Sequence, residues 1–341
     1  MKKFIFFRND RLGDFLILTS IIKSIKEKYK DSHITVVCSP LNYSLVKKYK
    51  IINQVYLHSK KNSVFKKISL LRRINNSNYH ASFAVDGKSF SNFCNFLIKS
   101  KYKLGLVYNY KIFNFWFTKP NFFYKYFIFD KYETFTSKKD LTNIQHLPTK
   151  LISLANHFKL NLKTKKNYYF DVSLKNKKSF KKFYAKFINK KYVLFHFDEK
   201  WSDINHVDNK LLLNLLKLQR RIKIKIIITT FKNKNKYFLN LKKQISENKK
   251  NKNILLVENS SLPFFERLIN HSICSISCHS GFLVQMAGAN SSNLIDIIHK
   301  KDYNWYSSWK PKNTKHKFIF KSNIDKIFMN IEIALKSYKN V

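Results

Sequence analysis

Glycine is scarce in this chain: only five of its 341 residues are glycine, whereas an average composition would supply roughly 7%. In a chain with so few glycines, we expect each one at a position where a backbone conformation or a close approach allows few other residues. Two of the five lie where a short apolar run gives way to a helix-like segment, at Gly13 in RNDRLGDF and at Gly281 in CHSGFLV. Such a junction directs backbone N–H groups and the positive end of a helix dipole at one place, which favours phosphate. Two junctions indicate two nucleotide-binding-like halves that face a shared cleft.

Cysteine is also rare, with four residues at positions 38, 94, 274 and 278. This number does not form a disulfide framework at this length. His271, Cys274, Cys278 and His279 lie close together in the sequence, but no second ligand pair follows at zinc-site spacing, and Cys274 fits the interior of a buried strand. We therefore expect no metal site and no cofactor.

Long apolar runs are missing. None approaches the ~18–20 residues of a membrane span. The opening MKKFIFFRNDR contains five apolar residues, fewer than the ~7–15 of a signal peptide core. The protein is expected to remain in the cytoplasm and to meet the cytoplasmic membrane only from its inner face, as a peripheral protein.

Acidic residues are few, with 20 Asp and Glu against 66 Lys and Arg, a net charge of +46. Only seven of the basic residues are arginine, and lysine accompanies frequent Asn, Ile, Phe and Tyr, which is typical of the coding bias of an AT-rich genome. The surface is nevertheless expected to attract anionic membranes or polyanions, and charge alone does not choose between them. The chain is 44% hydrophobic and 16% aromatic, enough to build substantial cores.

Short apolar runs alternate with amphipathic segments along most of the chain, which predicts parallel sheets covered on both faces. We expect an N-terminal, acceptor-side Rossmann-like domain at 1–165 and a C-terminal, nucleotide-sugar-binding Rossmann-like domain at 175–341, with a boundary near 160–178. For the last helix, at 324–338, packing against the first domain is an alternative to packing within the second. Strands are expected at 4–7, 34–38, 54–57, 81–85 and 103–107, and then at 192–197, 223–229, 254–257, 273–277 and 293–298.

The middle of the chain, at 108–145, is aromatic and irregular. We favour an insertion or a set of edge elements, because large exposed apolar patches are uncommon in soluble monomers. The alternative is an aromatic surface at 113–129 that contacts an acceptor or a membrane interface.

The segment RNDRLGDFLILTSIIKSIK contains Arg8, Asp10, Arg11, Gly13 and Asp14 in a turn between a strand and a helix, with Leu-Thr in the helix. Later in the chain, SCHSGFLVQMA places Ser277, Ser280, Gly281 and Ala287 at a second turn, and FAVDGKSFSN with KLGLV lies between the two. These segments resemble the ADP-heptose:lipopolysaccharide heptosyltransferase family over nearly the whole chain. The similarity is strong at the N-terminus and weaker at the second turn, where His279 replaces an acidic residue, Phe282 a proline and Val284 a histidine.

The resemblance implies an α/β protein of the GT-B fold, with two doubly wound Rossmann-like domains facing a central cleft. It also implies an inverting, metal-independent transfer of heptose or a related sugar from a nucleotide-diphosphate donor, with ADP-heptose favoured. The family's general base corresponds to Asp14. A carboxylate at a helix N-terminus stays ionised readily and is suited to take a proton from an attacking hydroxyl. The alternative role of Asp14, and of Asp10, is to cap the helix.

The expected donor-binding residues are Ser280 and Gly281, whose N–H groups suit a diphosphate, with His279 and Lys200. His279 either binds phosphate or packs in the turn. For Ser280 the alternative role is that of an ordinary helix N-cap. Lys200 falls near the position of a basic residue over the phosphates in the family. Arg8, Arg11 and Gly13 are expected at the acceptor site, since arginine binds phosphate or carboxylate through a bidentate fork. Solvated arginines beside the cleft are the alternative.

The predicted acceptor is a lipopolysaccharide core, another glycolipid or an oligosaccharide. Within the same fold, a different donor, a non-lipid acceptor or a catalytically inactive paralogue remains open. A nucleic-acid-binding protein is a separate alternative that the charge suggests. However, the lysines are spread along the chain, and no helix-turn-helix, zinc-finger or RNA-recognition motif is visible, so no specific nucleic acid is expected.

Overall fold

The computed structural model describes most of the chain. The predicted domain boundary at 160–178 lies outside the described residues except for position 160, and of the aromatic stretch 113–129 only 115–117, 125 and 127–129 are described. The described residues are 1–112, 115–117, 125, 127–136, 146–160, 180–185, 191–204, 207–231, 236–247, 253–312 and 314–339.

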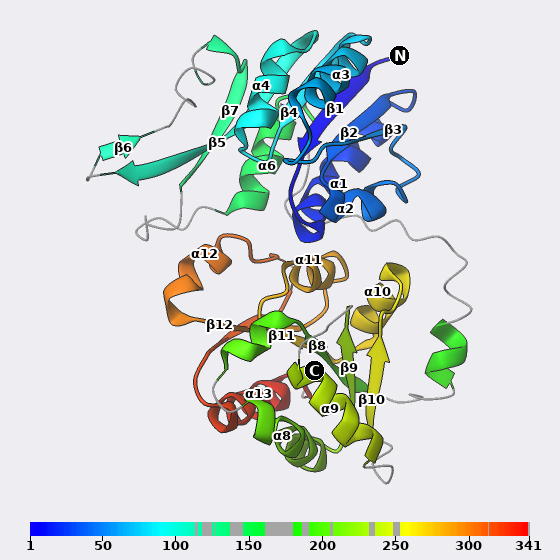
Figure 1. The fold of residues 1–341 in the computed structure, drawn as a ribbon, viewed down its shortest axis with the longest axis vertical. Helices are drawn as coiled ribbons and strands as arrows, with labels where there is room; N and C mark the ends of the chain where they lie inside the picture. The colour runs from blue at the N-terminus through cyan, green and yellow to red at the C-terminus, as the bar shows by residue number, and fades with distance from the viewer. Residues whose placement is uncertain are drawn as a thin grey trace. The chain divides into compact units, whose positions relative to one another are not determined.

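The chain divides into two compact units. The first comprises Met1–Asp171 and Asn304–Lys310, and the second Val172–Tyr303 and Pro311–Val341. Each unit contains one main sheet, and Figure 1 shows helices on both sides of each.

The sheet of the first unit has the order β3-β2-β1-β4-β5-β6, and β7 also pairs with β5. All pairings are parallel except that of β5 with β6. The order reverses at β1, so the carboxyl ends of β1 and β4 mark the topological switch point. The strands are β1 (Lys3–Arg8), β2 (His33–Cys38), β3 (Gln54–Leu57), β4 (Tyr79–Ala84), β5 (Ser100–Ile112), β6 (Phe115–Phe117) and β7 (Lys131–Thr136).

Strand β1 shows why the central strands of this sheet are rich in apolar residues: both of its faces are covered. Ile5 and Phe7 pack with residues of two helices on one side of the sheet. Phe4 contacts the rings of Tyr29 and Phe158, whose centroids lie 5.6 and 6.1 Å away. A parallel strand buried on both faces needs apolar side chains at successive positions. The helices are α1 (Leu12–Lys28), α2 (Pro40–Val46), α3 (Val64–Asn75), α4 (Ser89–Leu97) and α6 (Leu147–Asn156).

The second unit has a six-stranded, wholly parallel sheet of order β10-β9-β8-β11-β12-β13. Its order reverses at β8, which places the switch point at the carboxyl ends of β8 and β11. The strands are β8 (Tyr192–Phe197), β9 (Lys225–Thr230), β10 (Ile254–Glu258), β11 (Cys274–Ser277), β12 (Leu294–Ile298) and β13 (His316–Phe320). The helices are η2 (Glu199–Asp203), α8 (Val207–Ile222), α9 (Lys236–Glu247), α10 (Leu262–His271), α11 (Gly281–Ala289), η3 (Lys300–Asp302), α12 (Tyr303–Ser307) and α13 (Ile324–Lys339).

These two sheets confirm the predicted α/β class with two doubly wound Rossmann-like domains. Each predicted strand coincides with an observed one, with ends shifted by a few residues at most sites. The sequence did not predict β6, β7, β13 or α12 as separate elements. These elements are short or mix polar with apolar residues.

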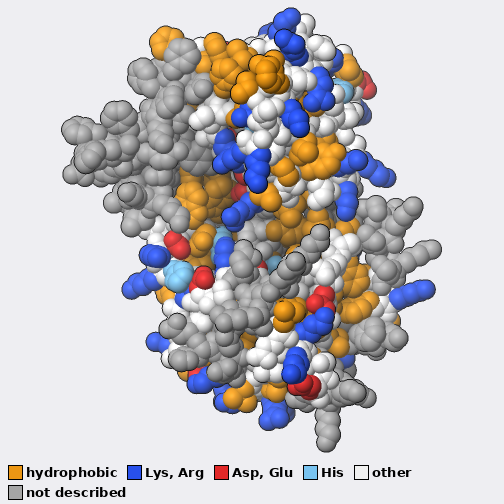
Figure 2. Space-filling view, viewed as in Figure 1, with side chains coloured by type: hydrophobic (Ala, Val, Ile, Leu, Met, Phe, Trp, Pro, Cys, Tyr) orange, Lys and Arg blue, Asp and Glu red, His pale blue; other side chains and the backbone are white. Residues whose placement is uncertain are grey.

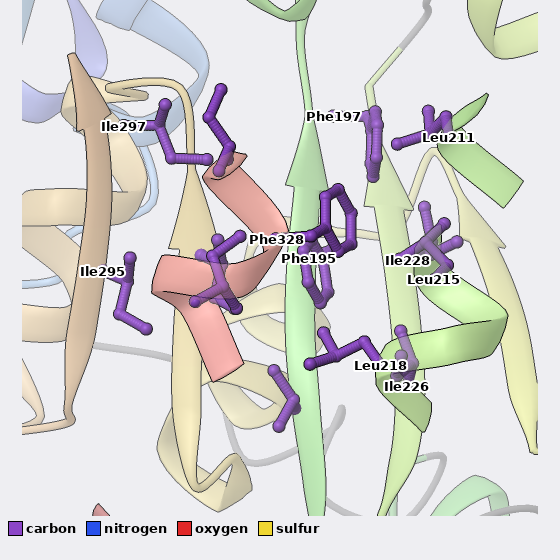
Figure 3. Close-up of a cluster of buried hydrophobic side chains, with 14 of the residues drawn as sticks. Phe195, Phe197, Leu211, Leu215, Leu218, Ile226, Ile228, Ile295, Ile297 and Phe328 are labelled. Carbon is purple, nitrogen blue, oxygen red and sulfur yellow. The ribbon is translucent and has the colours of Figure 1, made fainter. Parts of the chain in front are cut away.

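The terminal helix α13 packs one face on the core of the second unit. Phe328 of this helix stacks on Phe195 of β8, with ring centroids 5.9 Å apart (Figure 3). The expectation that this helix could pack back on the first domain is therefore wrong. The C-terminal segment that belongs with the first unit is Asn304–Lys310. Its Trp305 and Trp309 lie edge-on to Phe135 of β7, at 5.9 and 6.2 Å between centroids.

Gly105 of β5 is required by a close approach. A Cβ atom at this position would lie 2.2 Å from Cε2 of the Phe129 ring, well inside van der Waals contact. Phe129 is buried and packs with Ala84 and Val107. The glycine therefore leaves room for an aromatic side chain in the core, as expected for a residue used so sparingly.

Candidate functional site

Arg8, the last residue of β1, organises the turn that carries the N-terminal motif. Its side chain is completely buried. Nε donates to the backbone oxygen of Asp14 at 3.0 Å and lies 3.3 Å from Oδ1 of Asp10. A second guanidinium nitrogen donates to the backbone oxygen of Val85, after β4. Arg8 thus joins the loops that follow β1 and β4 at the switch point.

Asp14 is the third residue of α1, and its side chain is held from two directions. Oδ2 accepts a hydrogen bond from the backbone N–H of Arg11 at 3.1 Å, and Oδ1 lies 3.8 Å from the Arg8 guanidinium. The Asp14 side chain is still 27% exposed. The helix dipole favours negative charge here. The arrangement gives a carboxylate that is held in place and still accessible to solvent.

Two further carboxylates lie at this edge of the sheet. Asp86 is buried and accepts hydrogen bonds from the backbone N–H of Asn9 at 2.9 Å, from Ser91 Oγ at 2.6 Å and from the backbone N–H of Lys88 at 3.0 Å. Burial raises the pKa of Asp10 well above its usual range, although the Arg8 charge opposes the shift. Asp14 is therefore the carboxylate of this group that combines exposure with an ion pair and a helix N-terminus.

The predicted acceptor residues occupy different environments. Arg11 is exposed and precedes the first residue of α1, where its backbone N–H binds Asp14. Gly13 is buried as the second residue of α1. Arg8 is buried, and the bonds described above occupy it within the protein. In this structure Arg8 holds the turn, and Arg11 is the exposed arginine of the pair.

His58, which the sequence analysis did not single out, also lies at a carboxyl end in this sheet, directly after β3. Its backbone N–H donates to Cys38 at the end of β2. Its ring is buried and stacks on Phe90, with centroids 3.6 Å apart. Burial, with the nearby Lys67 and Lys88 charges, lowers the pKa of His58 to about 4, and Asp86 opposes the shift.

This imidazole makes the stability of the protein depend on pH. Its folded-state pKa lies below the ~6.5 of an unfolded chain, so the unfolded state binds the proton more readily between these values. The stabilisation is complete above about pH 6.5 and is lost as the pH falls toward 4. The free energy of unfolding in urea should fall when the pH is lowered from about 7.5 to about 5. In His58→Phe this fall should be smaller by about 1–2 kcal/mol. The phenylalanine keeps the ring on Phe90.

The control for this measurement is His157→Phe, at an exposed position, which should leave the pH dependence as it is in the wild type. Equal losses in His58→Phe and the wild type would show that His58 does not carry the effect.

The second unit brings four predicted donor residues together at its own switch point. Lys200 lies in η2, after β8, and its Nζ donates to the backbone oxygen of His279 at 2.7 Å, in the turn after β11. Ser280 and Gly281 follow in the same turn and begin α11. A lysine, a histidine and a helix N-terminus therefore meet at one edge of this sheet.

His279 is fixed by a carboxylate that the sequence analysis missed. Its Nδ1 lies 2.6 Å from Oδ2 of Asp296, a fully buried residue of β12. Burial alone would raise the pKa of Asp296. The nearby His279 and His316 lower it by more than burial raises it, and the pKa is about 2. Asp296 is thus ionised and orients the imidazole. His279 also has a φ of 54°, in the left-handed region, a strained conformation of the kind found at functional sites.

The N-terminus of α11 lacks an ordinary cap. Ser280 stands at the N-cap position, yet its side chain makes no capping hydrogen bond. A Cβ atom placed on the next residue, Gly281, would meet no atom within 4 Å. The first turn of α11 therefore offers backbone N–H groups, and open space above Gly281, to an anion.

Asp296 could have been suspected from the sequence only by its place in an apolar strand, LIDII, since a buried carboxylate usually has a partner. Lys321 was also missed; its Nζ donates to the backbone oxygen of Lys200 at 3.0 Å and supports η2. Among the described residues, no group of three or more His, Cys, Asp and Glu is arranged to hold a metal ion.

The fold defines a two-domain α/β protein with one doubly wound sheet in each unit, and the candidate site of the second unit lies at its switch point. No protein-family model matches the sequence, and no curated protein matches it either. In the described parts of the chain, no helix has the length and apolar character needed to cross a bilayer.

Solved structures with the same fold include those that the sequence resemblance points to. A glycosyl transferase of family 9 from Veillonella parvula matches with a TM-score of 0.66 and 13% identity, over 100% of this chain and 90% of that chain. The ADP-heptose lps heptosyltransferase II of E. coli matches with a TM-score of 0.67 and 12% identity, over 99% and 98%. The E. coli heptosyltransferase WaaC, solved with ADP, gives 0.66 and 12%, over 98% and 99%. The shared fold extends through both units.

Proposed function

We propose that the protein is a glycosyltransferase that moves heptose or a related sugar from a nucleotide-diphosphate donor to a lipopolysaccharide core or a similar glycan. The observation that carries this proposal is the cluster of Lys200, His279 and the uncapped start of α11 at the switch point of the second unit. It occurs in a chain that shares its fold, over nearly its full length, with heptosyltransferases.

The proposed donor is ADP-heptose. One of the similar structures is titled as an ADP-heptose heptosyltransferase, and another contains ADP. The diphosphate would bind at the N-terminus of α11, where backbone N–H groups and the helix dipole favour negative charge. Lys200 would supply positive charge. His279, held in place by Asp296, would donate to the diphosphate from Nε2 in its protonated form.

In the proposed reaction the Asp14 carboxylate takes the proton of an acceptor hydroxyl while its oxygen attacks the anomeric carbon. The bond from that carbon to the phosphate oxygen breaks, and the nucleoside diphosphate leaves with the electron pair. Attack from the side opposite the leaving group inverts the configuration. The negative charge that develops on the phosphate is stabilised by preorganised donors, so the lysine, the histidine and the helix N-terminus replace a metal ion in this proposal.

The acceptor is proposed to bind to the first unit, near Asp14. Arg11 is exposed at this edge and would bind an acidic group of the acceptor through its guanidinium. Gly13 would allow the acceptor to approach the start of α1. Arg8 would position Asp14 through its hydrogen bond to the backbone oxygen and its ion pair with the carboxylate. A glycolipid acceptor would bring the protein to the inner face of the cytoplasmic membrane.

Gly281→Ala tests the donor site because it separates binding from folding. The new methyl group meets no protein atom within 4 Å, so the free energy of unfolding should stay the same or rise by up to about 1 kcal/mol. A bound diphosphate would occupy that space, and we expect the affinity for ADP to fall at least about tenfold. The measurement is thermal unfolding with and without ADP, together with calorimetric titration.

The matched control is Ser89→Ala, at the exposed first position of α4, which should bind ADP like the wild type. Unchanged ADP affinity in Gly281→Ala would contradict the site. Failure of ADP, UDP and GDP to stabilise the wild-type protein would contradict the proposed donor class. Binding of ADP-heptose without turnover on a lipopolysaccharide core would favour an inactive paralogue, the alternative that His279 suggests.

A further inference from the structure

Helix α4 has its polar and apolar faces reversed. Its buried residues include Ser91, Asn92 and Asn95, whereas Phe93 is 47% exposed and Phe96 is 41% exposed. The buried polar groups are used within the protein: Ser91 binds Asp86, and Asn95 donates to the backbone oxygen of Leu104 at 3.1 Å. A helix at the surface of a soluble protein normally turns its apolar stripe inward.

The outward stripe of α4 is completed by Leu97, one turn beyond Phe93. Residues three and four apart share one side of a helix, so Phe93, Phe96 and Leu97 form a continuous apolar ridge. Each of these side chains keeps more than two fifths of its surface exposed, although the Lys103 ammonium lies 5.8 Å from the centroid of the Phe96 ring. Packing within this unit therefore does not account for the exposed part of the ridge.

The neighbouring helix α3 also exposes apolar side chains. It exposes Val64, Ile68 and Phe65, the last of which is 83% exposed. Asn75 at the end of α3 donates to the backbone oxygen of Leu97 at 3.2 Å, so the two helices lie side by side. Both also contribute to one buried cluster on the same side of the sheet. We call the six exposed apolar residues, Val64, Phe65, Ile68, Phe93, Phe96 and Leu97, the α3–α4 face.

The charge around the α3–α4 face is of one sign. Asp86 is the only acidic residue between positions 32 and 129, and it is buried. Figure 2 shows basic side chains among hydrophobic ones over this part of the first unit. The exposed basic residues on α3, beside it and after α4 are Lys60, Lys61, Lys66, Arg72, Arg73 and Lys99.

The helices of the second unit differ in this respect. Exposed cations of α8 pair with acids of α13: Lys210 lies 2.9 Å from Asp325, and Arg221 lies 2.9 Å from Glu332. Within 58–103, a range the structure describes in full, no ion pair is found. The positive charge near the α3–α4 face is thus not neutralised by neighbouring carboxylates.

We propose that the α3–α4 face binds the surface of an anionic lipid bilayer. Phenylalanine and leucine side chains enter the boundary between headgroups and acyl chains, as those of interfacial amphipathic helices do. Each lysine or arginine near an anionic surface adds about 1 kcal/mol of attraction. A nucleic acid would use the charge but not the exposed apolar ridge, and an apolar protein groove would not use the charge. The proposal goes beyond the transfer reaction and does not depend on it.

The experiment is flotation of the full chain with vesicles of phosphatidylcholine, with and without phosphatidylglycerol. The wild type should float with the anionic vesicles and not with the neutral ones. The double variant Phe93→Gln with Phe96→Gln should bind at least about tenfold more weakly, and so should Lys66→Glu with Arg72→Glu. These positions are exposed, so thermal unfolding should stay close to that of the wild type.

The matched control is Leu239→Gln with Ile333→Gln, two exposed apolar residues of α9 and α13, which should float like the wild type. Undiminished flotation of the phenylalanine variant, or an equal loss in the control, would overturn the proposal. Binding of double-stranded DNA that falls as much as vesicle binding in the phenylalanine variant would also overturn it. Flotation is measured without turnover, so its result is separate from that of the proposed transfer.

Discussion

Asp14→Asn is expected to fold like the wild type and to lose transfer by a factor of about 10²–10⁴, the usual contribution of a general base. The asparagine keeps an oxygen that accepts from the backbone N–H of Arg11, the bond that Asp14 makes at 3.1 Å. It loses the ion pair with Arg8 and the favourable charge at the helix N-terminus, together about 1 kcal/mol or less. The free energy of unfolding by urea and the release of ADP from ADP-heptose, with a lipopolysaccharide core as acceptor, are the two measurements.

Asp31→Asn is the control for this change. It makes the same substitution at an exposed residue just beyond the other end of α1 and should leave turnover unchanged. Undiminished turnover in Asp14→Asn would remove this residue from the role of base. If Asp10→Asn instead abolished turnover, the base would be the neighbouring carboxylate, whose pKa burial raises.

The fold could be predicted because the strands of a doubly wound sheet are buried on both faces. Runs such as FIFF in β1 and VLF in β8 have no polar alternation, and helices with one apolar side separate them. This local signal is strong wherever a strand lies in the middle of a sheet. It weakens at the edges: β13 mixes buried and exposed residues in HKFIF, and β7 contains KYETFT.

The candidate sites were predictable where their residues share a turn. Asp14, Arg11 and Gly13 occur within four positions, and His279, Ser280 and Gly281 are consecutive. The partners that fix them are remote in the sequence. Asp296 reaches His279 because β12 lies beside β11 in the sheet, and Val85 reaches Arg8 because β4 lies beside β1. Contacts of this kind depend on which strands are neighbours in the sheet, so a local sequence pattern does not predict them.

The same reason explains Arg8. From the sequence, an arginine beside a glycine-containing turn at the end of a strand resembles a ligand for an acidic substrate. Its exposure depends on what β4 places over it, and the buried guanidinium is occupied by Asp10, Asp14 and Val85. A buried arginine that satisfies backbone oxygens and carboxylates stabilises the geometry of a site.

His279→Asn is expected to leave the protein folded and to weaken ADP binding about tenfold or more, since it removes an imidazole that suits a phosphate. Asparagine is chosen for two structural reasons. It tolerates the left-handed backbone that His279 adopts, with φ of 54°, and its amide N–H can donate to the buried Asp296 carboxylate in place of Nδ1. The free energy of unfolding should therefore fall by only about 1 kcal/mol or less.

His279→Ala should behave differently, and the contrast separates the two roles of the residue. Alanine cannot donate to Asp296 and is strained at a positive φ, so the buried carboxylate loses the closest of its two histidine partners. Leaving a buried charge without its partner costs up to about 3–5 kcal/mol; His316 remains near Asp296, so about 2 kcal/mol is expected here. Urea unfolding measures this loss, and calorimetric titration with ADP measures binding in both variants.

The pH at which stability is lost gives an independent test of the same pair. The folded-state pKa of Asp296, about 2, lies below the ~3.9 of an unfolded aspartate, so its stabilisation is present above about pH 4 and is lost as the pH falls toward 2. In His279→Ala this loss should begin at a higher pH, because the carboxylate has lost a charge partner, while His157→Gln should match the wild type. If His279→Asn bound ADP like the wild type, the imidazole would serve only to hold the turn through Asp296, and the diphosphate would depend on Lys200 and the start of α11.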